Sequence, residues 1–310
     1  MKKILLASCV AAISAGVNAE LTPLSEYELH TVTGQAGIDI ELDVGVSIGE
    51  VRYTDTEVIT QEIIQVDPDG DGVFEDQIID VSDGDGGSLV ISNIFLGGDE
   101  TRTTLLGKPT STPNTSNLDN LKFAVDIQSD GDLIIDGQPA GGGVVDFLLK
   151  TGEIALESAD RQSRHVLVDS LSIYGGALGF KMVVDGETND IRFEVEASVD
   201  DMDIDMSSLG INISNAMIKD STFIERGGID NPSGLLISQH TFIVNMNMSK
   251  TEDGEGVKFE FLKDPFAPVN DFNVFDVYVE ELSIGGGLIG SIAIDDLDIN
   301  GVSFVVSGHP

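Results

Sequence analysis

The residues with the clearest spacing for chemistry are the acids of the segment Asp67-Pro68-Asp69-Gly70-Asp71-Gly72. Aspartate at every second position brings carboxylate oxygens towards one point, as in calcium-binding loops. The twelfth position from Asp67 is Ile78, so the bidentate acid of a complete EF-hand is absent and nearby acids would have to replace it. We therefore predict a candidate Ca²⁺ site formed by Asp67, Asp69, Asp71, Glu75 and Asp76. The same stretch also favours a plain hairpin turn without metal.

No other group of residues in the sequence is spaced for catalysis. The four histidines, His30, His165, His240 and His309, are scattered singly, without a second His or Cys at ligand spacing. A GxSxG nucleophile motif is absent, and the glycine-rich stretches lack the Lys and the following helix of a phosphate-binding loop. We therefore predict that the protein is not an enzyme.

The N-terminus has the composition of a secretory signal peptide. Lys2 and Lys3 precede an apolar run from Ile4 to Val17, and Ala19 ends a small-residue cleavage site. Residues 1–19 are thus predicted to be removed, giving a secreted or cell-surface protein exported via the periplasm. The apolar run is shorter than the roughly 20 residues of a membrane-spanning helix, so no membrane span is expected. Cys9, the only cysteine, lies in this signal, so the fold must form without disulfide bonds.

The charge balance is strongly acidic. The chain has 16 basic and 54 acidic residues, for a net charge of −38. Such a field repels nucleic acid and anionic membrane surfaces, and suits divalent cations or cationic partners. An acidic surface also keeps a protein soluble without any partner.

Apolar and polar residues alternate over much of the remaining chain. From Ile38 to Ile48 one side is apolar and the other mainly acidic, and Ile191–Val199 repeats the pattern. A sheet with one apolar face must pack on another sheet, fold over itself or meet a partner. We predict an all-β fold, either an elongated antiparallel sandwich or a folded-over sheet, with one short N-terminal helix. A β-solenoid is the alternative.

A weak internal repeat relates residues 166–186 to residues 277–297. Both copies contain Leu-Ser-Ile followed by three glycines, and glycine within a strand marks a bulge, a bend or a close approach of backbones. We expect these glycines to let the sheet fold over itself. The aligned trios are Gly175, Gly176 and Gly179 in the first copy, and Gly286, Gly287 and Gly290 in the second.

Composition divides the chain into five segments. Residues 99–120 are rich in Thr, Ser, Pro and Asn and read as a loop or linker. The predicted segments are the signal peptide 1–19, a short capped helix and glycine turn over 20–37, an acidic β segment with the Asp-rich loop over 38–98, the loop or linker 99–120, and a main β domain over 121–310.

The segment after the signal predicts the single helix. Ser25 and Glu28 form a capping box, and Gly34 suits the end of the helix. The arrangement Leu24-Ser25-x-x-Glu28-Leu29-x-x-Val32-x-Gly34-Gln35-Ala36-Gly37, followed by an acidic alternating strand, resembles the N-terminal signature of FilA-like pilus-system proteins of Gram-negative bacteria. The resemblance implies an exported component of the cell surface or of a filament.

These observations give two functional hypotheses. The first is a structural or adhesive protein of the cell surface or of an extracellular filament, whose partners are other surface or filament subunits, including further copies of itself. Leu24–Gly37 and the following strand would then dock between subunits. The second is a periplasmic or secreted binding module that holds a lipid or other apolar ligand between its apolar faces. Its groove would be lined by Met202, Met206, Met246 and Met248.

Overall fold

The structure, a computed structural model, describes residues 37–55, 59–66, 75–82, 86–109, 115–140, 143–262 and 272–307, and of 59–66 and 75–82 only the backbone. Within these ranges the helical segments are three single 3₁₀ turns, η1 (Ser207–Leu209), η2 (Pro232–Gly234) and η3 (Ile237–Gln239), and most other residues form strands. The all-β prediction is therefore confirmed. None of the described helical segments has the length and apolar character to cross a membrane. The predicted signal peptide and N-terminal helix lie outside the described residues.

Most strands belong to one large antiparallel sheet that has two arms. The first arm contains, in spatial order, β2 (Val46–Thr54), β5 (Ser88–Gly97), β10 (Val145–Thr151) with β11 (Ile154–Glu157), β12 (Arg164–Val168) with the first half of β13 (Ser170–Val184), the second half of β14 (Ile191–Met206), β15 (Ile211–Asp220), β18 (Val274–Ile284) and β19 (Gly287–Asp298). The second arm contains β1 (Ile38–Val44), β8 (Leu118–Ile127), β9 (Leu133–Pro139), the second half of β13, the first half of β14, β16 (Phe242–Lys250), β17 (Gly256–Phe261) and β20 (Ser303–Ser307).

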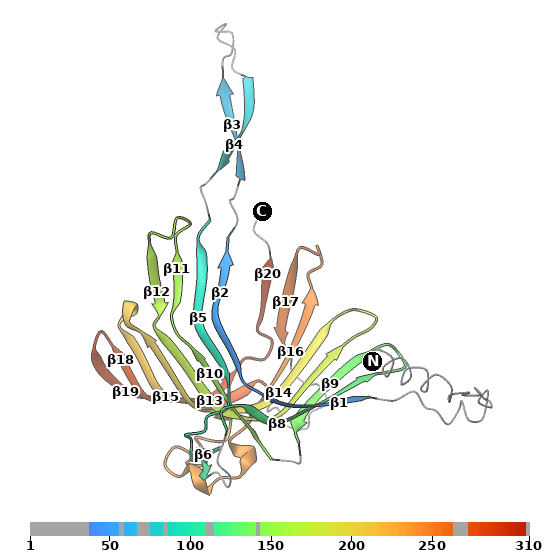
Figure 1. The fold of residues 1–310 in the computed structure, drawn as a ribbon, viewed down its shortest axis with the longest axis vertical. Helices are drawn as coiled ribbons and strands as arrows, with labels where there is room; N and C mark the ends of the chain where they lie inside the picture. The colour runs from blue at the N-terminus through green and yellow to red at the C-terminus, as the bar shows by residue number, and fades with distance from the viewer. Residues whose placement is uncertain are drawn as a thin grey trace, which may run out of the picture. The chain divides into compact units, whose positions relative to one another are not determined.

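Each arm is thus eight strands wide, and each of these eight positions in one arm continues into the matching position in the other. We call the boundary between the arms the fold line. β1 continues into β2 through Gly45, and β13 and β14 are long enough to run through both arms (Figure 1). In β14, for example, Ile191–Ala197 pair with β16 of the second arm, whereas Val199–Met206 pair with β15 of the first. The structure is thus an antiparallel meander whose strands bend part-way along their length, at the fold line. This is the predicted folded-over sheet.

Bulges at the fold line account for the bend. The pairing of β13 with β14 shifts register between Tyr174 and Gly175 and again between Ala177 and Gly179, and bulges bend and twist the strands that carry them. A Cβ atom at Gly175 would clash with the carbonyl oxygen of Ser198. The expectation that these glycines mark bulges and close approaches is confirmed for Gly175 and Gly179. In the second copy of the repeat, Gly286 has a φ of 77° in the turn between β18 and β19.

The other predictions on architecture have mixed outcomes. All ladders between the described strands are antiparallel, so the β-solenoid, which stacks parallel rungs, is wrong for this part of the chain. Strands from 38–98 and from 121–310 share one sheet. The segment 99–120 contains the short pair β6 (Thr104–Leu105) and β7 (Lys108–Pro109) and the start of β8. The remaining strands, β3 (Ile59–Val66) and β4 (Glu75–Ser82), form a separate hairpin.

The buried core of the described residues is small and lies mainly at the fold line. The connections β5–β8 and β15–β16 cover the sheet there, through Leu106 and Phe223, which are almost fully buried. They lie beside Tyr174, Lys219 and His240, which are buried as well. The core therefore holds the bend, while most of the area of the two arms extends beyond it.

Candidate functional site

A row of eight apolar residues crosses the first arm from edge to edge. Each residue lies directly opposite the next on the neighbouring strand, and directly opposite residues share one face of a sheet. The row consists of Val46, Leu96, Leu149, Ile173, Met202, Ala216, Val279 and Ile292.

Two similar rows, each spanning seven strands, cross the second arm. Their members are again direct partners across the ladders, and none of them is charged. One row consists of Ile38, Val125, Ile135, Met182, Phe193, Met246 and Phe261. The other consists of Ile127, Leu133, Val184, Ile191, Met248, Phe259 and Phe304.

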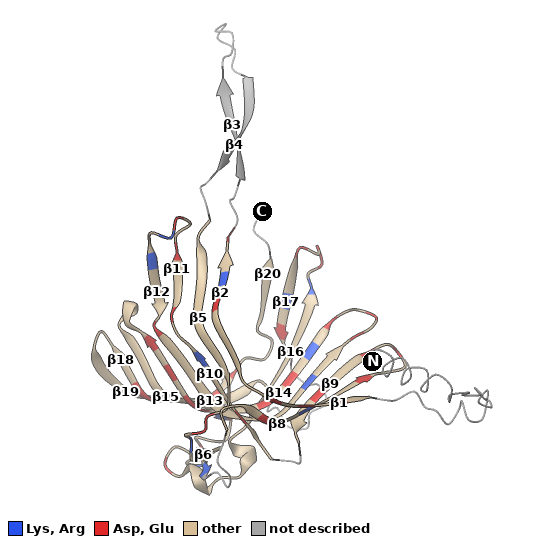
Figure 2. Cartoon of the chain, in the orientation of Figure 1, with Lys and Arg blue, Asp and Glu red and all other residues tan. Residues whose placement is uncertain are grey.

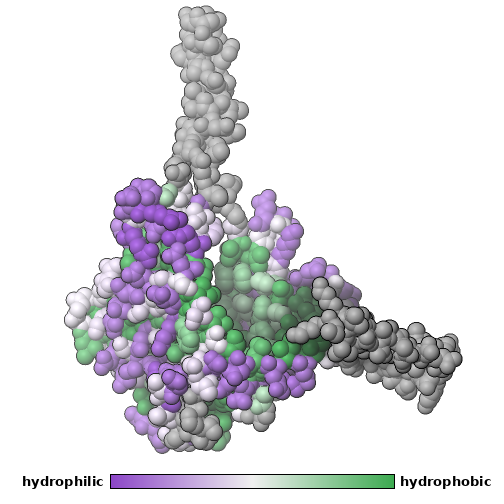
Figure 3. All heavy atoms as spheres, viewed as in Figure 1, coloured by the Kyte–Doolittle hydropathy of each residue, from purple (hydrophilic) through white to green (hydrophobic). Residues whose placement is uncertain are grey.

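The apolar rows of both arms lie on the same side of the continuous sheet, which we call the inner face. The pairs Gly175–Val199 and Ala177–Ala197 carry this side through the fold line. There Phe242 of the second arm and Phe275 of the first lie with ring centroids 5.6 Å apart, so the arms converge. Figure 3 shows the resulting apolar surface inside a hollow between the arms. The bend thus turns two apolar faces towards one another.

The inner face is not closed by its own chain within the described residues. Side chains near the fold line, such as Phe242 and Ala197, are half-buried or buried, but those near the edges and outer ends of the arms are open to solvent. Ile38 is 62% exposed, and Tyr53 and Ile127 are each 67% exposed. Soluble monomers rarely leave contiguous apolar patches larger than a few hundred Å² uncovered unless the patch binds something. The inner face is therefore the candidate binding surface.

The four methionines that the sequence analysis assigned to a groove all lie on this face. Met202 and Met206 belong to the first arm, where Met206 is opposite Ile211. Met246 and Met248 belong to the second arm, opposite Phe261 and Phe259. All four are half-buried. Because methionine is unbranched and its sulfur is polarisable, these side chains suit a surface that adapts to its ligand.

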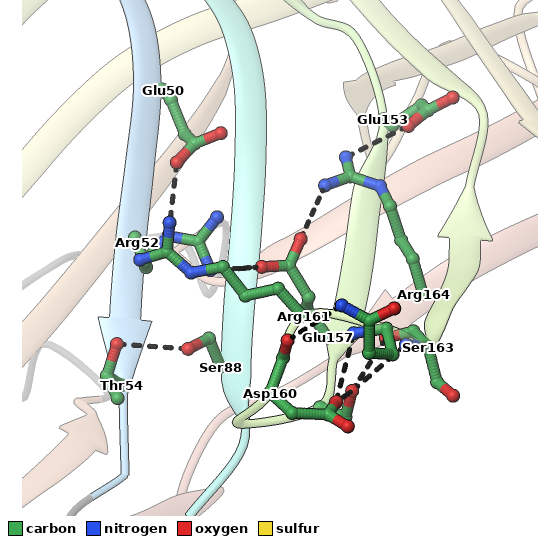
Figure 4. A network of polar contacts seen from close by, with 12 residues as sticks. Glu50, Arg52, Thr54, Ser88, Glu153, Glu157, Asp160, Arg161, Ser163 and Arg164 are labelled. Carbon is green, nitrogen blue, oxygen red and sulfur yellow. Dashed lines mark hydrogen bonds and ion pairs between the residues drawn. The ribbon is translucent and has the colours of Figure 1, made fainter.

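The opposite, outer face is polar and contains networks of ion pairs. In the first arm, Glu157 accepts hydrogen bonds from Arg52 at 2.7 Å and from Arg164 at 3.2 Å, and Arg164 also binds Glu153 (Figure 4). The hydrogen bond from Arg52 lowers the pKa of Glu157, and the same bond raises the pKa of Arg52. The outer face thus carries paired charges, in contrast to the apolar rows of the inner face.

A polar cavity of about 180 Å³ lies at the fold line on the outer side. Two ion pairs line it, Lys219 with Asp200 and Arg102 with Asp201. Asp200 also accepts hydrogen bonds from the Ser198 hydroxyl at 2.9 Å and from the backbone N–H of Leu106. The cavity thus joins β14 and β15 to the connection between β5 and β8.

Burial governs the ionisation of the groups in this cavity. Burial lowers the pKa of Lys219, against the opposing effect of Asp200. Burial, followed by the charge of Lys219, also lowers the pKa of His240, so this imidazole is neutral at physiological pH. The Arg102 guanidinium stacks over the Tyr174 ring, 4.8 Å from its centroid. We interpret this cluster as a set of polar contacts that holds the β5–β8 and β15–β16 connections against the bent sheet. Sequence reasoning missed it, although Lys219 is the one cation in β15, directly after the apolar run Ala216–Ile218.

The predicted calcium ligands are only partly described. Asp67, Asp69 and Asp71 lie outside the described residues, and Glu75 and Asp76 are the first residues of β4, where they pair with Val66 and Gln65. Calcium binding by this segment therefore stays a prediction.

A different group of acids comes together within the described part of the chain. One ligand atom from each of Asp276, Asp295 and Asp296 lies within 4.8 Å of the others. The Asp276 carboxylate already accepts backbone N–H groups of Ile224 at 2.7 Å and Asp296 at 3.0 Å, and burial raises its pKa. Its hydrogen bonds identify it as a structural acid between β18, β19 and the loop after β15.

The N-terminal part of the chain, which forms one edge of the inner face, is similar to a known protein family. Residues 1–129 match the model of DUF6160, a family of unknown function. The matched part includes β1, β2, β5 and β8, and so one edge of the inner face in both arms. No curated protein and no solved structure matches the chain. The resemblance of Leu24–Gly37 to FilA-like proteins stays a prediction.

Proposed function

We propose that the protein is an exported, non-enzymatic binding module that holds a slender apolar ligand, such as a lipid or hydrocarbon chain, in the hollow between its arms. The observation that carries this proposal is the largely apolar inner face, which spans both arms and remains exposed among the described residues. Burying methylene groups against such a surface stabilises a complex by about 0.8 kcal/mol each. A chain of about sixteen methylenes thus offers roughly 13 kcal/mol of gross free energy, which is enough for micromolar binding after about 4–5 kcal/mol offsets the entropy of association.

The shape and polarity of the arms favour a slender occupant over a second copy of the protein. Among the described residues, the extensive apolar surface that a second copy offers is its own inner face, which is also concave. Inserting one arm of that copy into the hollow would place its charged outer face, with residues such as Arg192 and Glu194, against the apolar rows. Burying unpaired charges is costly. An acyl chain is apolar on all sides and meets no such conflict.

A matched pair of substitutions tests the proposal. Met246 lies on the inner face and its neighbour Asn247 lies on the outer face, opposite Arg192 and Glu260. Binding of the neutral fluorophore N-phenyl-1-naphthylamine to the processed protein should weaken at least about tenfold in Met246→Lys and remain unchanged in Asn247→Lys. Met246→Leu, with retained affinity, would show that the position tolerates substitution. Equal affinities of the two lysine variants, at equal circular dichroism, would refute the proposal.

A second candidate function is assembly into a surface or filament structure, and the free edges of the sheet favour it. β1 and β2 at one side, and β19 and β20 at the other, each have a single strand partner among the described residues. Unpaired edges can add a strand from another subunit. Electron microscopy of the processed protein with and without Ca²⁺ tests this candidate, because persistent monomers under both conditions would contradict it.

A further inference from the structure

We infer that the ligand of the inner face is a long-chain lipid whose polar end is uncharged or cationic, and that the turns at the outer ends of the second arm select against an anionic end. This inference rests on the proposed function and adds the chemical class of the ligand. It follows from the charge around the opening of the hollow.

Three neighbouring turns close the strands of the second arm at the end away from the fold line. They connect β8 to β9 (residues 128–132), β13 to β14 (185–190) and β16 to β17 (251–255). They contain two, three and three acids, eight in total, and no Lys or Arg. Figure 2 shows acidic positions, in red, in turns at the ends of the strands of this arm. A ligand lying along the second arm therefore ends beside a group of negative charges.

Hydrogen bonds hold several of these acids in place. Asp185 accepts the backbone N–H groups of Glu187 and Thr188, both at 2.8 Å, and Asp253 accepts the Thr251 hydroxyl at 2.6 Å. Asp132 accepts the backbone N–H of Gly186 at 2.9 Å and so links two of the turns. The hydrogen bonds lower the pKa values of Asp185 and Asp253. The hydrogen bonds thus favour the charged form of these two carboxylates.

One basic residue opposes this field from the inner face. Lys250, at the end of β16, lies opposite Val257 and is exposed. A single ammonium group next to eight acids leaves the opening negative. A carboxylate or phosphate end group would therefore be repelled, most strongly at low ionic strength, where charges act over more than about 10 Å. An ammonium end group would be attracted, and a hydroxyl end group would meet no net force.

The experiment compares three ligands with the same twelve-carbon chain: dodecanol, dodecyltrimethylammonium and laurate. Each is used below its micelle concentration to displace N-phenyl-1-naphthylamine from the processed protein at low and at high salt. We expect laurate to bind at least about tenfold more weakly than the other two at low salt, with the difference shrinking at high salt. Laurate binding as tightly as dodecanol at low salt would overturn the inference and leave the proposed function intact. Displacement by none of the three would instead contradict the proposed function.

Two sets of variants connect the selectivity to the turns. Glu187, Glu252 and Glu255 are exposed, and the triple variant Glu187→Gln/Glu252→Gln/Glu255→Gln should strengthen laurate binding several-fold and leave dodecanol binding unchanged. The control triple Glu100→Gln/Glu225→Gln/Asp230→Asn removes three exposed acids from the connections at the fold line and should change neither. Equal effects of the two triples would show that net charge, rather than the turns, sets the preference, and would overturn the inference. So would a loss of tight laurate binding in Lys250→Gln, because Lys250 would then be an anchor for an anionic end.

Discussion

Phe242 and Phe275 lie with their ring centroids 5.6 Å apart, one from each arm of the sheet. They meet on the inner face at the fold line. This contact joins strands that are not hydrogen-bonded to each other. It therefore helps to fix the angle between the arms.

Phe242→Ala should lower the free energy of unfolding by about 2–4 kcal/mol, because it removes a half-buried ring and one side of this contact. Chemical denaturation followed by circular dichroism measures the change. Phe304→Ala is the control, since Phe304 stacks on Phe259 near an edge of the second arm and is 47% exposed. Its cost should stay near 1 kcal/mol. If the control were the more damaging change, Phe242 would not be a core residue of the bend.

Gly175→Ala should destabilise the protein by about 2 kcal/mol or more, because the new Cβ would clash with the Ser198 carbonyl oxygen. Gly179, four residues on and also at a bulge, has no atom within 4 Å of its corresponding Cβ position. Gly179→Ala should thus change stability by no more than about 0.5 kcal/mol. Thermal unfolding of the two variants provides the comparison. Similar losses in both would mean that the bulges, rather than the close approach at Gly175, require glycine.

The contribution of Glu157 should depend on pH in a defined direction. Its pKa is lowered from the ordinary value of 4.5, mainly by the hydrogen bond from Arg52. A carboxyl group with a lowered folded-state pKa stabilises the fold above its unfolded-state pKa, and this stabilisation is lost as the pH falls through the folded-state value. Glu157→Gln should therefore shift the urea midpoint downward at pH 7 and have little effect at pH 3. Glu225→Gln, an exposed acid in a connection, should shift it at neither pH.

Removing one partner of the buried pair Lys219–Asp200 should be costly. Lys219→Met leaves the Asp200 carboxylate without its counter-charge, and such losses amount to about 3–5 kcal/mol. Adding Asp200→Asn should restore part of the stability, because the amide can still accept the Ser198 hydroxyl and needs no cation. Urea denaturation of both variants gives the comparison. A double variant no more stable than Lys219→Met would contradict the view that the unpaired charge causes the loss.

Local patterns in the sequence were enough to predict the strands and their apolar side. The alternation in Ile191–Val199 required a strand with one apolar face, and the structure has β14 there with Ile191, Phe193 and Val195 on the inner face. The methionines of the inner face followed from the same alternation. Such patterns are local, because the side of a strand on which a residue lies depends only on its neighbours in the chain.

The fold line and the polar cavity could not be predicted in the same way. The pairing of Ile38 with Val125, or of Lys219 with Asp200, depends on which distant segments become neighbours. In the sequence, nothing distinguishes Asp200 from the other acids of this acidic chain. Its burial arises from a bulge in β14 and from the β5–β8 connection, which contributes Leu106. Sequence reasoning also gave most weight to the Asp67–Asp71 loop, whose calcium binding stays a prediction.

The eight bent positions of the sheet repeat one geometric unit, a strand segment in each arm joined across the fold line. Neighbouring strands are about 4.8 Å apart, so eight of them form a trough about 34 Å long. Its cross-section depends on the bend, whereas its length depends only on how many units are stacked. A chain with one unit more or fewer would keep the same walls and hold more or fewer acyl chains side by side.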